Sequence, residues 1–128
     1  MVIAVTHGIK ITVRTQFQDQ YSKPEQGHYL FTYRVTIENN SEYTVKLLRR
    51  TWEIFDSSSE RRSVEGDGVV GQQPILMPGD IYEYESACNL NTEIGMMMGT
   101  YTMERQIDKA QFKVEIPEFE LITLARLN

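Results

Sequence analysis

The sequence predicts an all-β fold, an antiparallel β-sandwich of seven or eight short strands. Apolar and polar side chains alternate with a period of two in several runs, which is typical of half-buried strands. Clusters of turn-forming residues separate these runs at regular spacing. No window of about 10 residues shows helical periodicity bounded by caps. The length of 128 residues suits a single domain, covering the whole chain, with one hydrophobic core.

The expected strands follow from this alternation and from the turns between them. Ile75 and Leu76 also resemble a strand, and Pro117 is expected to end the strand before it. In chain order, we expect strands over residues 9–17, 29–38, 43–54, 61–64, 81–87, 97–103, 112–116 and 119–124.

Two irregularities and one core residue can also be predicted. The apolar positions change phase after Tyr43, so we expect a β-bulge near Leu47 and Leu48. Any helix should be a single turn, around residues 106–110. Trp52 is expected to be the large aromatic side chain between the two sheets. Because the chain has one cysteine, the sandwich should be of the immunoglobulin/fibronectin type III-like kind without a disulfide.

Composition excludes several classes of function. The net charge is −5 and no basic stripe is present, so neither nucleic acid nor a membrane is expected as a partner. The lone Cys88 and the absence of a signal-peptide pattern indicate a cytoplasmic protein. His7, His28 and Cys88 lie at no metal-ligand spacing, so we expect no metal site and no cofactor. No nucleophile motif or catalytic pair is visible, so we predict that the chain is not an enzyme and has no catalytic residues.

The segment from residue 64 to residue 79 contains a G-x-G-x-x-G string at Gly66, Gly68 and Gly71. In dinucleotide-binding proteins such a string joins a strand to a helix, whose N-terminus receives the pyrophosphate. Here Pro74 and Pro78 follow too closely for a helix to form. We therefore interpret the glycines as turn geometry at the rim of the sandwich, although a backbone phosphate nest without a helix stays an alternative.

The charges in this segment also disfavour phosphate. Glu65 and Asp67 would repel it by about 1 kcal/mol at ~4 Å in water and about 4 kcal/mol near a protein surface. The same carboxylates could offer two oxygens to a hard cation, but no EF-hand spacing accompanies them. Nearby cationic side chains that could offset the repulsion are Arg49, Arg50, Arg61 and Arg62.

An ordered set of motifs over most of the chain resembles the ApaG family, also called CorD. The match runs from about Val5 to Leu124, and Gln72 departs from it where the family often has Glu. The motifs are Val5-Thr6-His7-Gly8-Ile9, Tyr33-Arg34-Val35-Thr36-Ile37-Glu38-Asn39, Arg50-x-Trp52-x-Ile54-x-Asp56, Gly66-x-Gly68-Val69-Val70-Gly71-x-Gln73-Pro74-x-Leu76-x-Pro78-Gly79, Tyr82-x-Tyr84-x-Ser86, Gly95-x-Met97-x-Gly99-x-Tyr101-x-Met103 and Phe112-x-Val114-x-Ile116-Pro117-x-Phe119.

The resemblance implies a fibronectin type III-like sandwich in a small bacterial cytoplasmic protein. It also implies a genetic link to cobalt tolerance and magnesium efflux. Related domains occur in eukaryotic F-box proteins and in a polymerase-delta-interacting protein, where they look like protein-interaction modules. The family has no agreed catalytic residue, so the resemblance assigns none to this chain.

The leading hypothesis is a non-enzymatic protein-interaction module that uses an exposed loop together with a sheet face or edge. The alternative is a small-ligand sensor that binds pyrophosphate, a nucleotide or a divalent cation at the same loop. Met96, Met97 and Met98 are expected to fill the core, with an adaptable binding surface as the alternative. Exposed strand edges also leave a homodimer open. The candidate loop comprises Glu65, Gly66, Asp67, Gly68, Val69, Val70, Gly71, Gln72 and Gln73.

Overall fold

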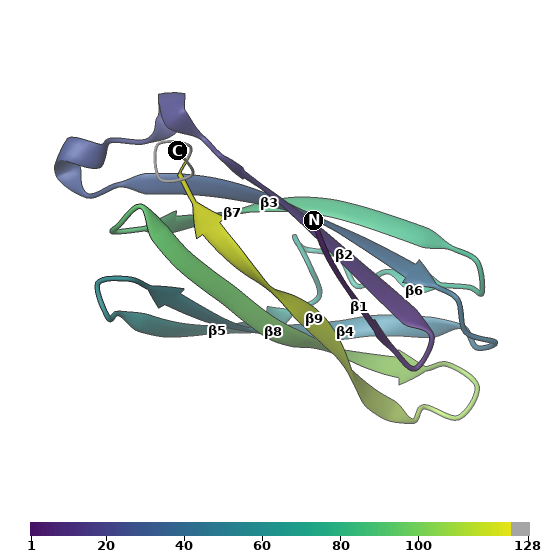
Figure 1. The fold of residues 1–128 in the computed structure, drawn as a ribbon. Coiled ribbons are helices and arrows are strands. Elements are labelled where there is room, and N and C mark those ends of the chain that lie inside the picture. The colour runs from purple at the N-terminus through teal and green to yellow at the C-terminus, as the bar shows by residue number, and fades with distance from the viewer. Residues whose placement is uncertain (124–128) are drawn as a thin grey trace.

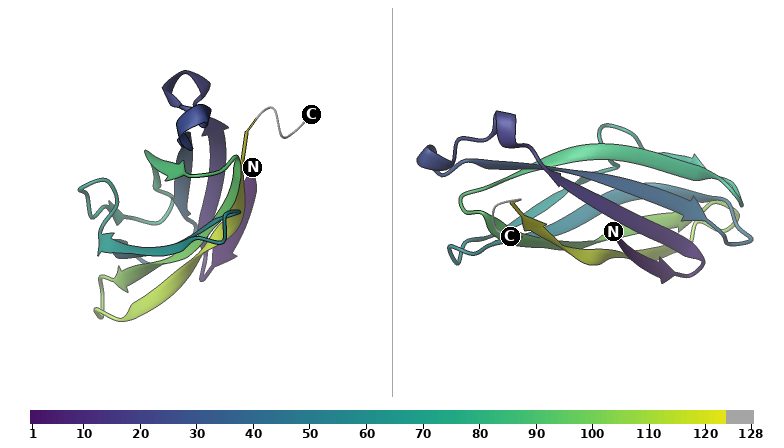
Figure 2. Two further views of the ribbon diagram at one scale, coloured as in Figure 1. Left: turned by 90° about the vertical axis from the view of Figure 1, so that its left-hand side faces the viewer. Right: turned by 45° about the horizontal axis from the view of Figure 1, so that its top comes forward.

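The computed structural model describes residues 1–123, which form two antiparallel sheets packed face to face (Figures 1 and 2). This confirms the predicted sandwich. The first sheet has the strand order β1 (Val2–Thr6), β2 (Ile9–Phe17), β3 (Tyr29–Asn39) and β7 (Ile81–Leu90). The second has the order β5 (Arg61–Asp67), β4 (Val45–Asp56), β8 (Ile94–Arg105) and β9 (Gln111–Ile122), with the short β6 (Ile75–Leu76) also paired to β4.

The core lies between the two sheets and is filled by the alternate residues of each strand. Trp52 is only 2% exposed, so its predicted core position is confirmed. Its ring lies 5.4 Å from that of Tyr33 and 5.9 Å from that of Phe119, with both pairs meeting edge to face. Aromatic pairs in this geometry add stabilisation beyond their buried area. Trp52 therefore joins β4 of one sheet to β3 of the other.

The expected β-bulge in β4 is confirmed. Leu47 pairs with Met103 and Arg49 with Thr102, so Leu48 is the extra residue. The bulge moves the inward-facing positions of β4 from odd to even numbers, which turns Arg50 toward the interior.

The expected strand end at Pro117 is wrong, because β9 continues through it. A second bulge absorbs the proline: Met97 pairs with Phe119 and Gly99 with Ile116. Two residues of β9 thus lie opposite Met98 alone, so the strand continues through Pro117 instead of ending there. Residue 124, the last residue of the expected final strand, lies outside the described residues.

The N-terminal strand β1 was not predicted. Ile3 and Val5 lie on its exposed positions, so the sequence shows no apolar and polar alternation there. β1 pairs with β2 and lies beside β9 (Figure 1). The Glu115 N–H of β9 donates to Thr6 Oγ1 of β1 at 3.2 Å. The two sheets therefore approach closely along their β1 and β9 edges.

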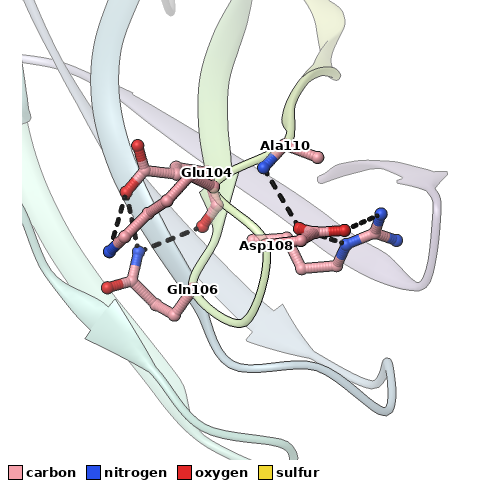
Figure 3. Close-up of polar contacts among 6 residues, drawn as sticks. Glu104, Gln106, Asp108 and Ala110 are labelled. Atoms are coloured by element: carbon pink, nitrogen blue, oxygen red, sulfur yellow. Dashed lines mark hydrogen bonds and ion pairs between the residues drawn. The ribbon is translucent and has the colours of Figure 1, made fainter.

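The single helical turn expected at residues 106–110 is wrong, because this segment is the turn of the β8–β9 hairpin. The Asp108 carboxylate accepts the Ala110 N–H, as Figure 3 shows. It also accepts hydrogen bonds from Arg105 Nε at 3.0 Å and from Arg105 Nη2 at 2.7 Å. These bonds hold the pKa of Asp108 below its ordinary value, with the Arg105 bond as the largest cause. The two short 3₁₀ helices lie instead between β2 and β3, at Asp19–Tyr21 (η1) and Pro24–Gln26 (η2).

A buried carboxylate holds the β7–β8 turn at the end of the sandwich that lies opposite the β8–β9 turn. Asp56, at the end of β4, is 7% exposed. Its Oδ2 accepts the Asn91 N–H at 2.5 Å, and its Oδ1 accepts the Thr92 hydroxyl. Because Asn91 and Thr92 form the β7–β8 turn, Asp56 ties that turn to the end of β4.

Candidate functional site

The candidate loop is partly strand. β5 was expected to end at Val64 but continues through Glu65, Gly66 and Asp67. The chain then crosses from the second sheet to the first over residues 68–80, which we call the crossover (Figure 1). The nine candidate residues therefore divide into the last three residues of an edge strand and the first six of a connection between sheets.

The three glycines of the G-x-G-x-x-G string have three different roles. A Cβ on Gly66 would lie 2.8 Å from the Arg50 guanidinium nitrogens, so this glycine makes room for that side chain. Gly68 has φ +61°, and a Cβ there would lie 2.0 Å from the Gln72 carbonyl oxygen. Gly71 has φ +76° and open space around it. The spacing is thus a consequence of local geometry at each position.

The polarity of the loop is opposite to that of a phosphate nest, which needs N–H groups that converge on the anion. The Gly68 N–H donates to the Leu48 carbonyl at 2.8 Å, and the N–H groups of Val69 and Gln72 donate to each other's carbonyls at 2.8 and 3.0 Å. Arg50 Nη1 instead donates to the carbonyl oxygens of Asp67 and Gly68, at 3.1 and 3.0 Å. The loop therefore directs carbonyl oxygens at an arginine of its own chain.

Val69 and Val70 occupy opposite environments in a tight turn. Residues 69–72 form a two-residue type I′ turn, since Val70 and Gly71 at its centre have φ +46° and +76°. Val69 is fully buried, so the expectation that it lies in an exposed loop is wrong. Val70 is 60% exposed at the tip. A β-branched residue rarely adopts positive φ, so Val70 is strained.

The crossover and the first residue of β7 carry exposed apolar side chains that sequence reasoning missed. Four large apolar side chains over 12 positions are each more than half exposed, and we call them the apolar rim: Val70, Ile75, Met77 and Ile81. Leu76, between two of them, is buried at 3% exposure and pairs with Val45 of β4. The alternation of Ile75, Leu76 and Met77 was the signal for this surface, since burial of the middle residue exposes its neighbours.

The crossover is held firmly at its second half. Asn39 Nδ2 donates to the Leu76 carbonyl at 2.9 Å. The Met77-Pro78-Gly79-Asp80 turn has the hydrogen bond from the Asp80 N–H to the Met77 carbonyl, and Gly79 has φ +90°. The apolar rim therefore projects from an ordered support.

Behind the loop, the interior contains a group of tyrosines that the sequence did not reveal. The hydroxyls of Tyr84 and Tyr101 form a hydrogen bond across the two sheets. Burial is the main cause that raises the pKa of Tyr101 well above its ordinary value, and it also raises the pKa of Tyr84. Both phenols are therefore neutral at physiological pH, and the pair acts as a buried polar contact rather than as an acid or base.

The two histidines and the cysteine, which the sequence offered as possible metal ligands, make contacts within the fold. The His7 ring packs edge to face on Phe112 at 5.6 Å, and His28 forms a β-bridge with Lys23. Cys88 is buried, which raises the pKa of its thiol. Among residues 1–123, no three His, Cys, Asp or Glu side chains are placed to share a metal ion. The described helices are also too short to cross a membrane.

The methionine stripe divides between core and surface. Met97 is buried at 1% exposure, as expected for core filling. Met96 and Met98 are half-buried, because neighbouring strand residues point to opposite faces.

A separate recess of about 350 Å³ lies near the β8–β9 turn and is lined by Arg105, but the Asp108 carboxylate already pairs with this arginine. The crossover is thus the stronger candidate.

Comparison with known proteins identifies a matching family model, similar sequences and a similar crystal structure. A family model described as the ApaG domain matches residues 19–105. Protein ApaG of Brucella canis is 49% identical over 121 residues, covering 94% of this chain and 92% of the relative. Protein ApaG of Anaeromyxobacter dehalogenans is 48% identical over 128 residues, which cover both chains fully. The crystal structure of a putative ApaA protein from Bordetella pertussis superposes with a TM-score of 0.87 at 38% identity, covering 91% of this chain and 94% of that one.

Proposed function

This chain belongs to the ApaG domain family, and from that premise we propose that it is a non-catalytic module that binds another protein through the apolar rim of the crossover. The observation that carries the proposal is Val70, an exposed apolar side chain held in a strained turn. Strain of this kind persists where the rest of the structure imposes it, and it is concentrated at functional positions.

The surface around Val70 supports a protein as the partner. Apolar side chains that are exposed together on an ordered connection are typical of protein-binding sites. The crossover pairs with the second sheet through β6 and continues into β7 of the first, so both sheets support it. We propose that the module acts in the cytoplasm, and that cobalt tolerance and magnesium efflux, which the family resemblance implies, are exerted through this partner.

Replacing Val70 with asparagine should raise stability and weaken partner binding at the same time. Asparagine adopts positive φ more readily than valine, so we expect the free energy of unfolding to rise by about 1 kcal/mol. The lost apolar contact should reduce partner capture at least ~10-fold. Denaturant unfolding measures the first effect, and quantitative affinity capture from a cell lysate, followed by mass spectrometry, measures the second.

Val5→Asn is the matched control, because Val5 is 63% exposed and lies on β1, away from the crossover. It should capture the same proteins as the wild type, while Val70→Asn and Ile75→Asn should both lose them. If folded Val70→Asn and Ile75→Asn proteins retain every partner that the wild type captures, the apolar rim is not the binding surface.

A further inference from the structure

The edge of the sandwich between β5 and β7 exposes side chains that face inward. These two strands end the two sheets on the side away from β1 and β9. Val64 pairs with the core residue Trp52, and Arg62 pairs with Ile54, which is also buried. Since paired residues project to the same face of a sheet, Val64 and Arg62 point inward. Val64 is nevertheless 37% exposed, so this edge is open to solvent.

Two arginines face this opening without a carboxylate partner. Arg50 points inward opposite Gly66, and its described hydrogen bonds go to two backbone carbonyls, those of Asp67 and Gly68. Arg62 Nη2 donates to the Asn89 carbonyl at 2.6 Å and lies 3.4 Å from Cys88 Sγ. Among the described residues, no carboxylate lies within 4 Å of either guanidinium. Among residues 1–123, the two inward-facing cations therefore have no ion-pair partner, although the chain has a net charge of −5.

The positions of the two arginines along the strands match the spacing of side chains in an extended peptide. Arg62 lies opposite Ile54, four positions along β4 from Arg50. At about 3.3 Å per residue, the two positions are about 13 Å apart along the strand, the spacing of residues i and i+4 in an extended peptide. Side chains at those positions point to the same side. Each of the flanking strands β5 and β7 also has one edge that pairs with no described strand, where a peptide backbone can be added.

We propose that this lateral opening, between β5 and β7 with Arg50 and Arg62 at its two ends, receives an extended acidic segment of the protein partner. Two carboxylates four residues apart pair with the two guanidiniums, and the segment lies beside the apolar rim. The inference rests on the proposed function, because it specifies the chemistry of the partner that the crossover binds.

The test is a titration of the ¹⁵N-labelled full chain with a short extended peptide that carries two aspartates four positions apart. We expect shifts of the Arg50 and Arg62 Nε–H signals and of the Val64 amide. The matching asparagine peptide should bind at least ~10-fold more weakly, and so should a peptide with the aspartates three apart. Arg62→Gln should reduce affinity for the aspartate peptide ~10-fold, as should Arg50→Gln if its loop stays folded.

The chain provides matched controls in its two adjacent arginine pairs. Arg49 and Arg61 each precede an inward-facing arginine and therefore point to the outer face of the same sheet. Arg49→Gln and Arg61→Gln remove the same charge and should leave peptide affinity unchanged.

Several results would overturn the inference. Equal binding of the asparagine peptide, or equal losses in the Arg49→Gln and Arg61→Gln proteins, would show that the inward-facing arginines recognise no acidic segment. Shifts produced by inorganic pyrophosphate but not by the aspartate peptide would assign the opening to a small anion. If the aspartate peptide fails while Val70→Asn still abolishes partner capture, the acidic segment is wrong and the apolar rim stands. If the peptide binds while Val70→Asn retains every partner, the apolar rim is wrong instead.

Discussion

Gly68→Ala is expected to lower the free energy of unfolding by about 2–5 kcal/mol, whereas Gly71→Ala should lower it by only about 1–2 kcal/mol. Both glycines have positive φ, which costs an alanine roughly 1–2 kcal/mol. Only at Gly68 would the new Cβ also lie 2.0 Å from a backbone oxygen, that of Gln72. Relieving such a contact moves the backbone, which costs roughly 1–3 kcal/mol more.

Chemical unfolding of the two variants measures the difference directly, since both add one methyl group to the same loop. Gly68→Ala should also shift the amide signals of Val69 and Gln72, whose mutual hydrogen bonds close the turn. Equal destabilisation by the two substitutions would mean that crowding at Gly68 does not restrain the loop.

Asp56→Ala is expected to lower the free energy of unfolding by about 3–6 kcal/mol. Hydrogen bonds to a charged group contribute roughly 1.5–3 kcal/mol each, and this carboxylate accepts bonds from Asn91 and Thr92. Their loss releases the β7–β8 turn from the end of β4. Thermal unfolding should show the decrease, and the amides of residues 91 and 92 should lose protection from hydrogen exchange.

The same carboxylate should make stability depend on acid pH. Burial alone would raise the pKa of Asp56, but the hydrogen bonds from Thr92 and Asn91 outweigh burial and lower it. A pKa that is lower in the folded than in the unfolded state gives stability that is fully present above the unfolded value, about 3.9. That stability is lost as the pH falls through the folded value.

Asp56→Asn tests this pH dependence, because asparagine keeps the shape and does not titrate. The free energy of unfolding of the wild type should fall more steeply than that of Asp56→Asn as the pH decreases from about 5 to about 2. Parallel pH profiles for the two proteins would show that Asp56 has the same pKa in both states.

The fold could be predicted largely from local patterns, because half-buried strands carry their period in the sequence. The bulge at Leu48 and the core position of Trp52 followed from the phase of apolar residues. β1 was not predicted, because its exposed positions carry the apolar residues Ile3 and Val5. β9 was divided at Pro117 because a proline normally ends a strand, and only the pairing with β8 shows the bulge that accommodates it.

The candidate site was less predictable, because its properties depend on contacts between distant segments. The sequence could exclude a helix after Gly71, but it could not show that Gly66 accommodates Arg50, 16 positions earlier. Nor could it show that Val69 is buried while Val70 is exposed, since that depends on a turn with two positive φ values. Which arginine of each adjacent pair faces inward follows from strand register and the β4 bulge.

The exposure of β5 should set the order in which the molecule opens. Six of the seven residues of β5 are exposed, and among residues 1–123 this strand pairs only with β4, whereas β4 pairs on both sides. Opening events that release β5 therefore need break only one ladder and uncover little apolar surface. The backbone amides of β5 should exchange with solvent well before those of β4 and β8. A partner that binds beside β5 would thus stabilise the strand that opens most readily. Slower exchange of the β5 backbone amides would show that the partner has bound.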